Sequence, residues 1–155
     1  CCSAYAMESP VLVQQDAPRG FELPKVRQIL ITSTRKVAEA LGTGRRESVY
    51  QCALKHELQA NLQKTVMLEY PIPILYENER VGVSYLDLLV ADDLFVEVKA
   101  LAKFGGKDAL QTSAYARDTG LVGALVNFKQ VPAGGIEIEF YDWAGKATLR
   151  PEAGH

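Results

Sequence analysis

The sequence is poor in the residues from which most zinc sites and nucleophilic centres are built. Its 155 residues include two histidines, His56 and His155, and three cysteines, Cys1, Cys2 and Cys52. The cysteines form no CxxC pair and no even-numbered framework, which predicts a reducing compartment and no zinc site. A Ser-His-Asp triad or a histidine metal site would have to use His56, which has no obvious partner.

Two further absences narrow the class of protein. No run of about 18 apolar residues occurs, and no charged segment followed by an apolar one opens the chain, so we expect a soluble, intracellular protein without a membrane partner. The formal net charge is -2. Proteins that coat nucleic acid are usually basic, so any nucleic-acid contact here must be local. With 48% hydrophobic and 23% charged residues, the composition is that of an ordinary globular domain.

The chain divides into an arm, one domain and a tail. Residues 1–25 contain three prolines and no sustained period, which predicts a flexible arm. Residues 26–150 form the single domain, and residues 151–155 form the tail. Apolar residues at helical spacing predict helices over Val26–Leu41 and Arg45–Gln63.

The middle of the domain is rich in valine, leucine, isoleucine and tyrosine. This composition predicts an antiparallel meander of three strands, at about residues 66–76, 81–90 and 94–100. Pro71 and Pro73 cannot donate ladder hydrogen bonds, so the first strand is predicted to be an edge or bulged strand.

The second half adds one helix and two strands. A helix is predicted from Gly105-Gly106 to Gly120, followed by a buried strand at 122–128 and a half-exposed strand at 136–143. The order ααβββαββ indicates an α/β or α+β fold in which helices flank one mixed sheet.

Charged residues interrupt two of these apolar strands. Asp87 lies mid-strand among leucines, and "FVEVKALAKF" places Glu97 and Lys99 on one side of the next strand, because alternate strand residues share a side. An unpaired buried carboxylate is costly, so something must neutralise it. Two carboxylates and a lysine on adjacent strands suggest a site for a hard cation such as Mg²⁺. The alternative is a buried ion triad in which the two acids share Lys99.

Two helical segments carry further candidate residues. "GRRESVY" places Glu47 and Tyr50 three positions apart on one helix face, and "QTSAY" places Gln111 and Tyr115 four apart. Each has a structural alternative. Gly44 would be the N-cap and Glu47 a first-turn carboxylate that favours the helix dipole, and the second pair would be an ordinary amphipathic edge.

Taken together, these segments resemble the GxxExxY family, a branch of the PD-(D/E)XK nuclease-like superfamily. The naming motif stands as Gly44-Arg-Arg-Glu47-Ser-Val-Tyr50, and "YPIPILYENERVGVSYLDLLV", "DLFVEVKAL", "QTSAYARDTG" and "GALVNF" follow in order. The similarity spans about residues 29–128. One departure is at Lys36-Val37-Ala38, where the family often carries Glu-Val-His.

The resemblance implies a restriction-endonuclease-like core with its active site at one edge of the sheet. It also implies a role for each matching residue. Metal would be held by Asp87, Glu97 and the backbone carbonyl of Val98, with Lys99 as catalytic lysine, Glu47 as the acid delivered from the preceding helix, and Gln111 and Tyr115 as a QxxxY element.

The leading hypothesis is therefore metal-dependent hydrolysis of phosphodiester bonds in nucleic acid, with DNA as the expected substrate and Mg²⁺ or Mn²⁺ as the cofactor. Four basic residues are expected to contact phosphate locally: Arg45, Arg46, Lys103 and Lys107. The alternative is that these residues simply form a solvated surface. Two rival hypotheses remain, a non-catalytic module that binds nucleic acid or protein, and an oligomeric assembly component that uses its arm as a strap. A homodimer is compatible with each of them.

Overall fold

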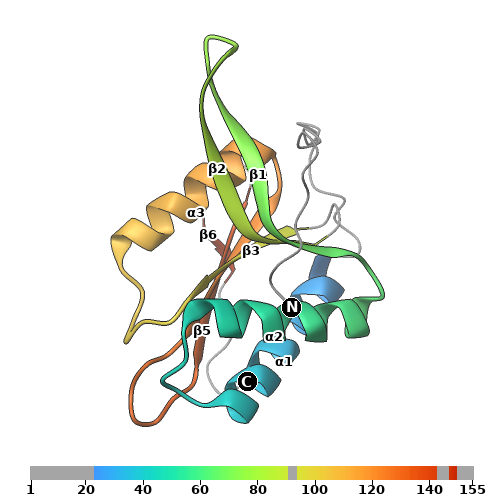
Figure 1. Cartoon of the computed structure of the whole chain (residues 1–155), viewed down its shortest axis with the longest axis vertical. Helices are drawn as coiled ribbons and strands as arrows, with labels where there is room; N and C mark the ends of the chain where they lie inside the picture. The colour runs from blue at the N-terminus through green and yellow to red at the C-terminus, as the bar shows by residue number, and fades with distance from the viewer. Residues whose placement is uncertain (1–22, 91–93, 143–146, 150–155) are drawn as a thin grey trace.

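The computed structural model describes residues 23–90, 94–142 and 147–149 (Figure 1). The predicted tail and all but the last three residues of the predicted arm lie outside these ranges.

Three helices and six strands make up the described part of the chain. In chain order they are α1 Leu23–Leu41, α2 Glu47–Leu62, β1 Val66–Tyr76, β2 Glu79–Val90, β3 Leu94–Lys99, α3 Gly106–Thr119, β4 Val122–Phe128, β5 Ile136–Tyr141 and β6 Ala147–Leu149. The order ααβββαββ is confirmed, and the short strand β6 follows it.

The strands form one mixed sheet in the order β1-β2-β3-β4-β5-β6. Strands β3 and β4 are parallel and every other neighbouring pair is antiparallel. The parallel pair needs a crossover connection, which α3 supplies. Strand β1 is at the edge and its register shifts between Ile74 and Leu75, as its prolines predicted.

The helix starts differ from those expected. Helix α1 begins at Leu23 rather than Val26, because Pro24 lies in the first turn, where its missing N–H is not needed. The predicted start of α2 at Arg45 and the predicted cap at Gly44 are both wrong. The N-cap is Arg46, in extended backbone, whereas Gly44 lies in the preceding turn with a φ of 89°.

Helices cover both faces of the sheet, with α1 and α2 on one face and α3 on the other (Figure 1). The larger apolar cluster joins α1 and α2 to alternate residues of the central strands. It includes Leu54 of α2 and the strand residues Leu88, Val96 and Val126. The smaller cluster lies under α3 and includes Phe95 and Leu125. The first turn of α2 and the first turn of α3 therefore approach the end of β3 from opposite faces.

Two other expectations meet the structure here. No helix within the described ranges combines the length and the apolar character needed to cross a membrane. Cys52, on α2, is disulfide-bonded. The cysteine count that predicted a reducing compartment did not anticipate this bond.

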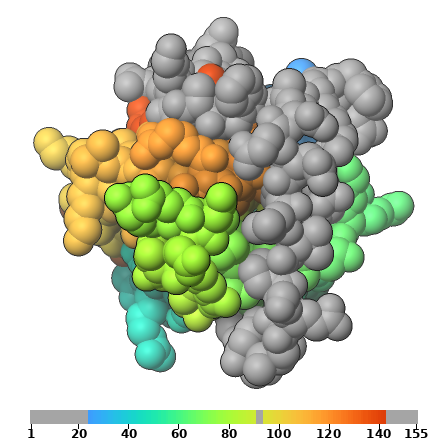
Figure 2. All heavy atoms as spheres, turned by 90° about the horizontal axis from the view of Figure 1, so that it is seen from above, coloured from blue at the N-terminus to red at the C-terminus, as the bar shows by residue number. Residues whose placement is uncertain are grey.

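The β1–β2 hairpin extends well beyond the rest of the sheet (Figure 1). Seen from above, its tip lies in front of α3 (Figure 2). The base of this hairpin carries Asp87, so the extension places one long two-stranded element beside the candidate site.

Close packing at one glycine gives a test of the central pair of strands. Gly123 of β4 is paired with Phe95 of β3, and a Cβ atom at Gly123 would overlap the Phe95 ring. We expect Gly123→Ala to destabilise the protein by about 1–3 kcal/mol, because the ring has to move out of a packed core. Urea denaturation measures the change. Gly106→Ala is the control, since nothing lies within 4 Å of its added methyl group, and an equal loss there would contradict this account.

Candidate functional site

The candidate site begins where the ladder between β2 and β3 stops. The last pair is Leu88 with Val96, and the next residues in register are Asp87 and Glu97. These two side chains replace the missing backbone bonds. The backbone N–H of Asp87 donates to Glu97 Oε2 at 2.9 Å, and the backbone N–H of Val98 donates to Asp87 Oδ2 at 2.8 Å. Each carboxylate is thus held by the opposite strand.

Each carboxylate keeps one oxygen that is not used in this exchange. Among the described residues, no hydrogen bond reaches Asp87 Oδ1 or Glu97 Oε1. The Glu97 side chain is nevertheless deeply buried, at 3% exposure. Asp87 and Glu97, hereafter the acidic pair, thus lie at facing positions of neighbouring strands, and each offers one further oxygen.

Burial makes this pair reluctant to ionise. Burial raises the pKa of Asp87 to about 6, and the hydrogen bond from Val98 only partly opposes this shift. Burial also raises the pKa of Glu97 well above its ordinary value, and the neighbouring charge of Asp87 adds to the effect. Lys99 lowers the pKa of both acids, but among the described residues this does not offset the effect of burial, so the site favours a proton or a cation.

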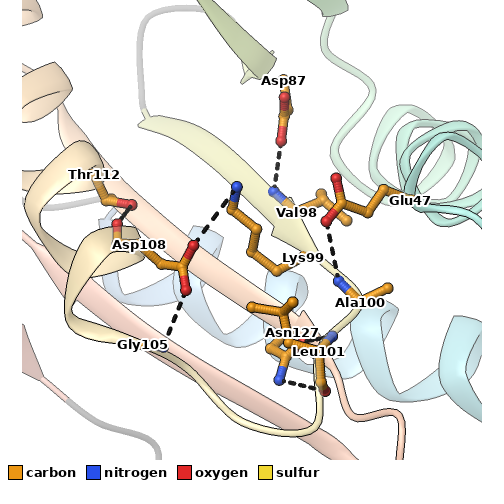
Figure 3. Close-up of polar contacts among 10 residues, drawn as sticks. All are labelled: Glu47, Asp87, Val98, Lys99, Ala100, Leu101, Gly105, Asp108, Thr112 and Asn127. Carbon is orange, nitrogen blue, oxygen red and sulfur yellow. Dashed lines mark hydrogen bonds and ion pairs between the residues drawn. The ribbon is translucent and has the colours of Figure 1, made fainter.

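Lys99 is bound to an acidic residue outside the pair (Figure 3). Its Nζ forms an ion pair with Asp108 Oδ1 at 3.7 Å and none with Asp87 or Glu97. The shared-lysine triad considered from the sequence is therefore wrong. The ammonium charge is still near enough to lower the pKa of both acids.

Asp108 was not identified from the sequence. It is the third residue of α3, and its Oδ2 accepts a hydrogen bond from the backbone N–H of Gly105 at 3.0 Å. The other oxygen faces Lys99 (Figure 3). One carboxylate thus caps the helix and restrains the lysine. The available signal was an acidic residue in the first turn of a helix that begins at glycine.

Glu47 reaches the site from the other face of the sheet. It is the first residue of α2, and its Oε2 accepts a hydrogen bond from the backbone N–H of Ala100 at 3.4 Å (Figure 3). Ala100 directly follows β3. The carboxylate is in the first turn, as the capping alternative expected, but the bond that it accepts comes from the end of β3.

The other two residues of the GxxExxY motif position this turn. Tyr50 is buried, its ring stacks on Phe128 at 4.3 Å, and its hydroxyl donates to the Gly42 carbonyl at 2.6 Å. The backbone N–H of Gly44 donates to Gln130 Oε1 at 2.7 Å. The motif therefore attaches the α1–α2 connection to the end of β4, which orients Glu47.

A buried asparagine holds the segment after β3. The side chain of Asn127, on β4, accepts from the backbone N–H of Leu101 at 2.8 Å and donates to the Leu101 carbonyl at 3.1 Å. Its amide also donates to Glu137 Oε1 at 2.8 Å. The sequence signal was an amide within an otherwise apolar, fully buried strand.

The two residues of the QxxxY segment differ in their surroundings. Tyr115 is half-buried, and its ring meets Phe95 edge to face at 6.3 Å. Burial and the nearby Glu97 charge both raise the pKa of Tyr115. Gln111 is exposed on α3 and forms no hydrogen bond among the described residues. The charges of Glu97 and Asp87 both act on Tyr115, so this residue lies close to the acidic pair.

The four basic residues expected to contact phosphate are all exposed: Arg45, Arg46, Lys103 and Lys107. Arg45 donates from its Nε to the Leu41 carbonyl at 3.2 Å, which holds it against the end of α1. Arg45 and Arg46 directly precede Glu47 in the chain, and Lys103 and Lys107 follow β3.

The family model of the PD-(D/E)XK nuclease superfamily matches residues 24–138. This chain belongs to the PD-(D/E)XK nuclease superfamily. No curated protein and no solved structure matches this chain. Membership indicates nuclease activity in general terms, and it accounts for the order of the motifs along the matched region.

PD-(D/E)XK nucleases use divalent metals, so the fit of this site to Mg²⁺ matters. Within the described part of the chain, no three histidine, cysteine, aspartate or glutamate side chains converge on one point. Asp87 and Glu97 offer two carboxylates with unused oxygens. Mg²⁺ is commonly held by one or two carboxylates while it keeps several waters, so this donor set fits the ion.

The raised pKa values predict an unusual pH dependence of stability in EDTA. A carboxyl group whose pKa is raised by folding stabilises the fold when the pH is below its ordinary pKa, which is 3.8 for Asp87. This stabilisation is lost as the pH rises through the pKa of about 6 that Asp87 has in the folded protein. We expect thermal melts of the wild type to show a loss on the order of 2 kcal/mol between pH 4 and pH 7. Glu97→Gln should reduce this loss and raise the melting temperature at pH 7. A variant that is less stable than the wild type at pH 7 would contradict the electrostatic account.

Proposed function

We propose that this protein is a Mg²⁺-dependent nuclease of the GxxExxY branch that hydrolyses phosphodiester bonds in DNA. The observation that carries the proposal is the acidic pair, in which half-buried Asp87 and buried Glu97 each keep an oxygen that no donor among the described residues uses. Superfamily membership independently indicates a nuclease.

In this proposal Asp87, Glu97 and the Val98 carbonyl hold the ion. Bound Mg²⁺ would activate a ligated water and offset the charge that develops at phosphorus. Burial strengthens the electrostatic attraction of the two carboxylates for a cation, because little water screens them. The crossed hydrogen bonds keep both carboxylates in place before the ion arrives, so little reorganisation is needed on binding.

Lys99 and Glu47 then act around the reacting phosphate. Lys99 orients the attacking water or offsets charge in the transition state, and its ion pair with Asp108 holds the ammonium on the α3 side. Glu47 orients water, or binds a second metal ion, through the oxygen that does not contact Ala100. Tyr115 supports the site beside Glu97, and Gln111 contacts substrate from the surface of α3.

Substrate phosphates would contact exposed basic residues that lie on both sides of the acidic pair. Arg45 and Arg46 lie at the start of α2, and Lys103 and Lys107 lie between β3 and the first turn of α3. Such contacts position nucleic acid without reading its sequence. They agree with a local rather than a general attraction, since the net charge is -2.

A second candidate function is a module that binds nucleic acid or protein without cleaving it. Two observations favour it, the absence of three converging acidic side chains among the described residues and the slightly negative net charge. The presence of Asp87, Glu97 and Lys99 together favours the nuclease.

The test is cleavage of single- and double-stranded DNA, and of RNA, by purified protein with Mg²⁺ or Mn²⁺. We expect Glu97→Gln to lower the cleavage rate by at least about 100-fold, because the ion loses a charged ligand. Glu39→Gln, an exposed change on α1, is the matched control and should retain full activity.

Metal binding separates the two candidates without relying on cleavage. Mg²⁺ or Mn²⁺ should raise the melting temperature of the wild type, since binding to the folded state stabilises it. Asp87→Ala should abolish that rise. Cleavage by Glu97→Gln at the wild-type rate would exclude the proposed nuclease site.

A further inference from the structure

Glu69 is an acidic residue beside the site that the sequence analysis did not single out. It lies on β1, between Leu68 and Tyr70, which pair with Leu88 and Leu86 of β2. This register places Glu69 directly opposite Asp87. Glu69 thus lies on the β1 side of Asp87, and Glu97 lies on the β3 side.

The backbone at Glu69 is not that of a regular strand. Its φ is 50°, and the Glu69–Asp87 position is absent from the paired ladder. The hairpin also changes face here. Leu68 packs in the cluster under α1 and α2, whereas Tyr70, two residues later, packs under α3. A left-handed conformation costs a residue other than glycine about 1–2 kcal/mol, so the fold keeps glutamate where glycine would be less strained.

The charge of Glu69 acts on the acidic pair. It raises the pKa of both Asp87 and Glu97, so it lies near each of them. Glu69 itself is exposed and forms no ion pair or hydrogen bond among the described residues. Without a cation, a third carboxylate at this position only adds repulsion. With a cation, the same charge becomes favourable.

A separate observation concerns the oxygen of Glu97 that the opposite strand does not bond. Glu97 is almost fully buried, yet its Oε1 receives no hydrogen bond from the described residues. Buried polar atoms are nearly always paired. The nearest cation, Lys99, has its own partner in Asp108. Glu97 Oε1 is not among the fully enclosed unpaired atoms of the described residues, so it is open to a water molecule or a bound cation.

We propose that Glu69 is a positioning residue that accepts a hydrogen bond from a water on the divalent ion held by Asp87 and Glu97. This inference rests on the proposed function. Mg²⁺ gives up its waters reluctantly, so a carboxylate one water away from the ion still contributes to binding. This arrangement also explains why three acidic side chains lie near one another without converging on one point. Partners of this kind typically change metal affinity by 10- to 100-fold.

The test is calorimetric titration of the full chain with Mn²⁺, without nucleic acid. We expect Glu69→Gln to weaken Mn²⁺ binding by about 10-fold. Glu77→Gln is the matched control. Glu77 lies in the same hairpin with the same φ of 50°, but at the exposed tip between β1 and β2, and its removal should leave the affinity unchanged.

A thermal melt in EDTA distinguishes positioning from a structural role. Removing the repulsive charge should leave Glu69→Gln at least as stable as the wild type without metal, whereas loss of a structural contact would lower its melting temperature. Equal Mn²⁺ affinity for Glu69→Gln and Glu77→Gln would overturn this inference.

The two proposals can fail separately. If Asp87→Asn abolishes Mn²⁺ binding while Glu69→Gln binds as the wild type does, the inference about Glu69 fails and the metal site stands. If Asp87→Asn binds Mn²⁺ as tightly as the wild type, the metal site itself fails.

Discussion

The site depends on a pair of crossed hydrogen bonds. In each, the carboxylate of Asp87 or Glu97 bonds to the backbone of the opposite strand. Where the β2–β3 ladder stops, each carboxylate accepts a backbone N–H from the other strand. The strand ends are therefore satisfied by charged groups instead of carbonyls. One oxygen of each acid serves the fold, and the other remains for chemistry. A neutral amide at either position would keep much of the bonding and remove the charge.

The surrounding structure can be understood as support for this junction. Glu47 and Asn127 bond to Ala100 and Leu101, the two residues that follow β3. Asp108 restrains Lys99 while it caps α3. Helices from both faces thus meet at one strand end. These contacts come from separate segments of the chain, so the position of the site depends on all of them.

The sequence predicted the architecture because the relevant signals are local. Helical spacing, apolar strand composition and the prolines of β1 each depend on neighbouring residues, and the two-residue period placed Glu97 and Lys99 on one side of β3. The partner of Lys99 depends on how α3 docks against the sheet, which no local pattern encodes. Glu69 was missed for a related reason. Glutamate carries no preference for a positive φ, and its position opposite Asp87 becomes visible only once the register is known.

The central claim is that half-buried Asp87 and buried Glu97, each with a spare oxygen, are arranged to hold a divalent ion. Crystals soaked in Mn²⁺ and measured at an anomalous wavelength test this most directly. The account predicts a single strong peak within about 2.0–2.3 Å of one oxygen each from Asp87 and Glu97, with ordered waters completing the shell. Crystals that show no peak there, with the two carboxyl groups joined to each other through a shared proton, would contradict it.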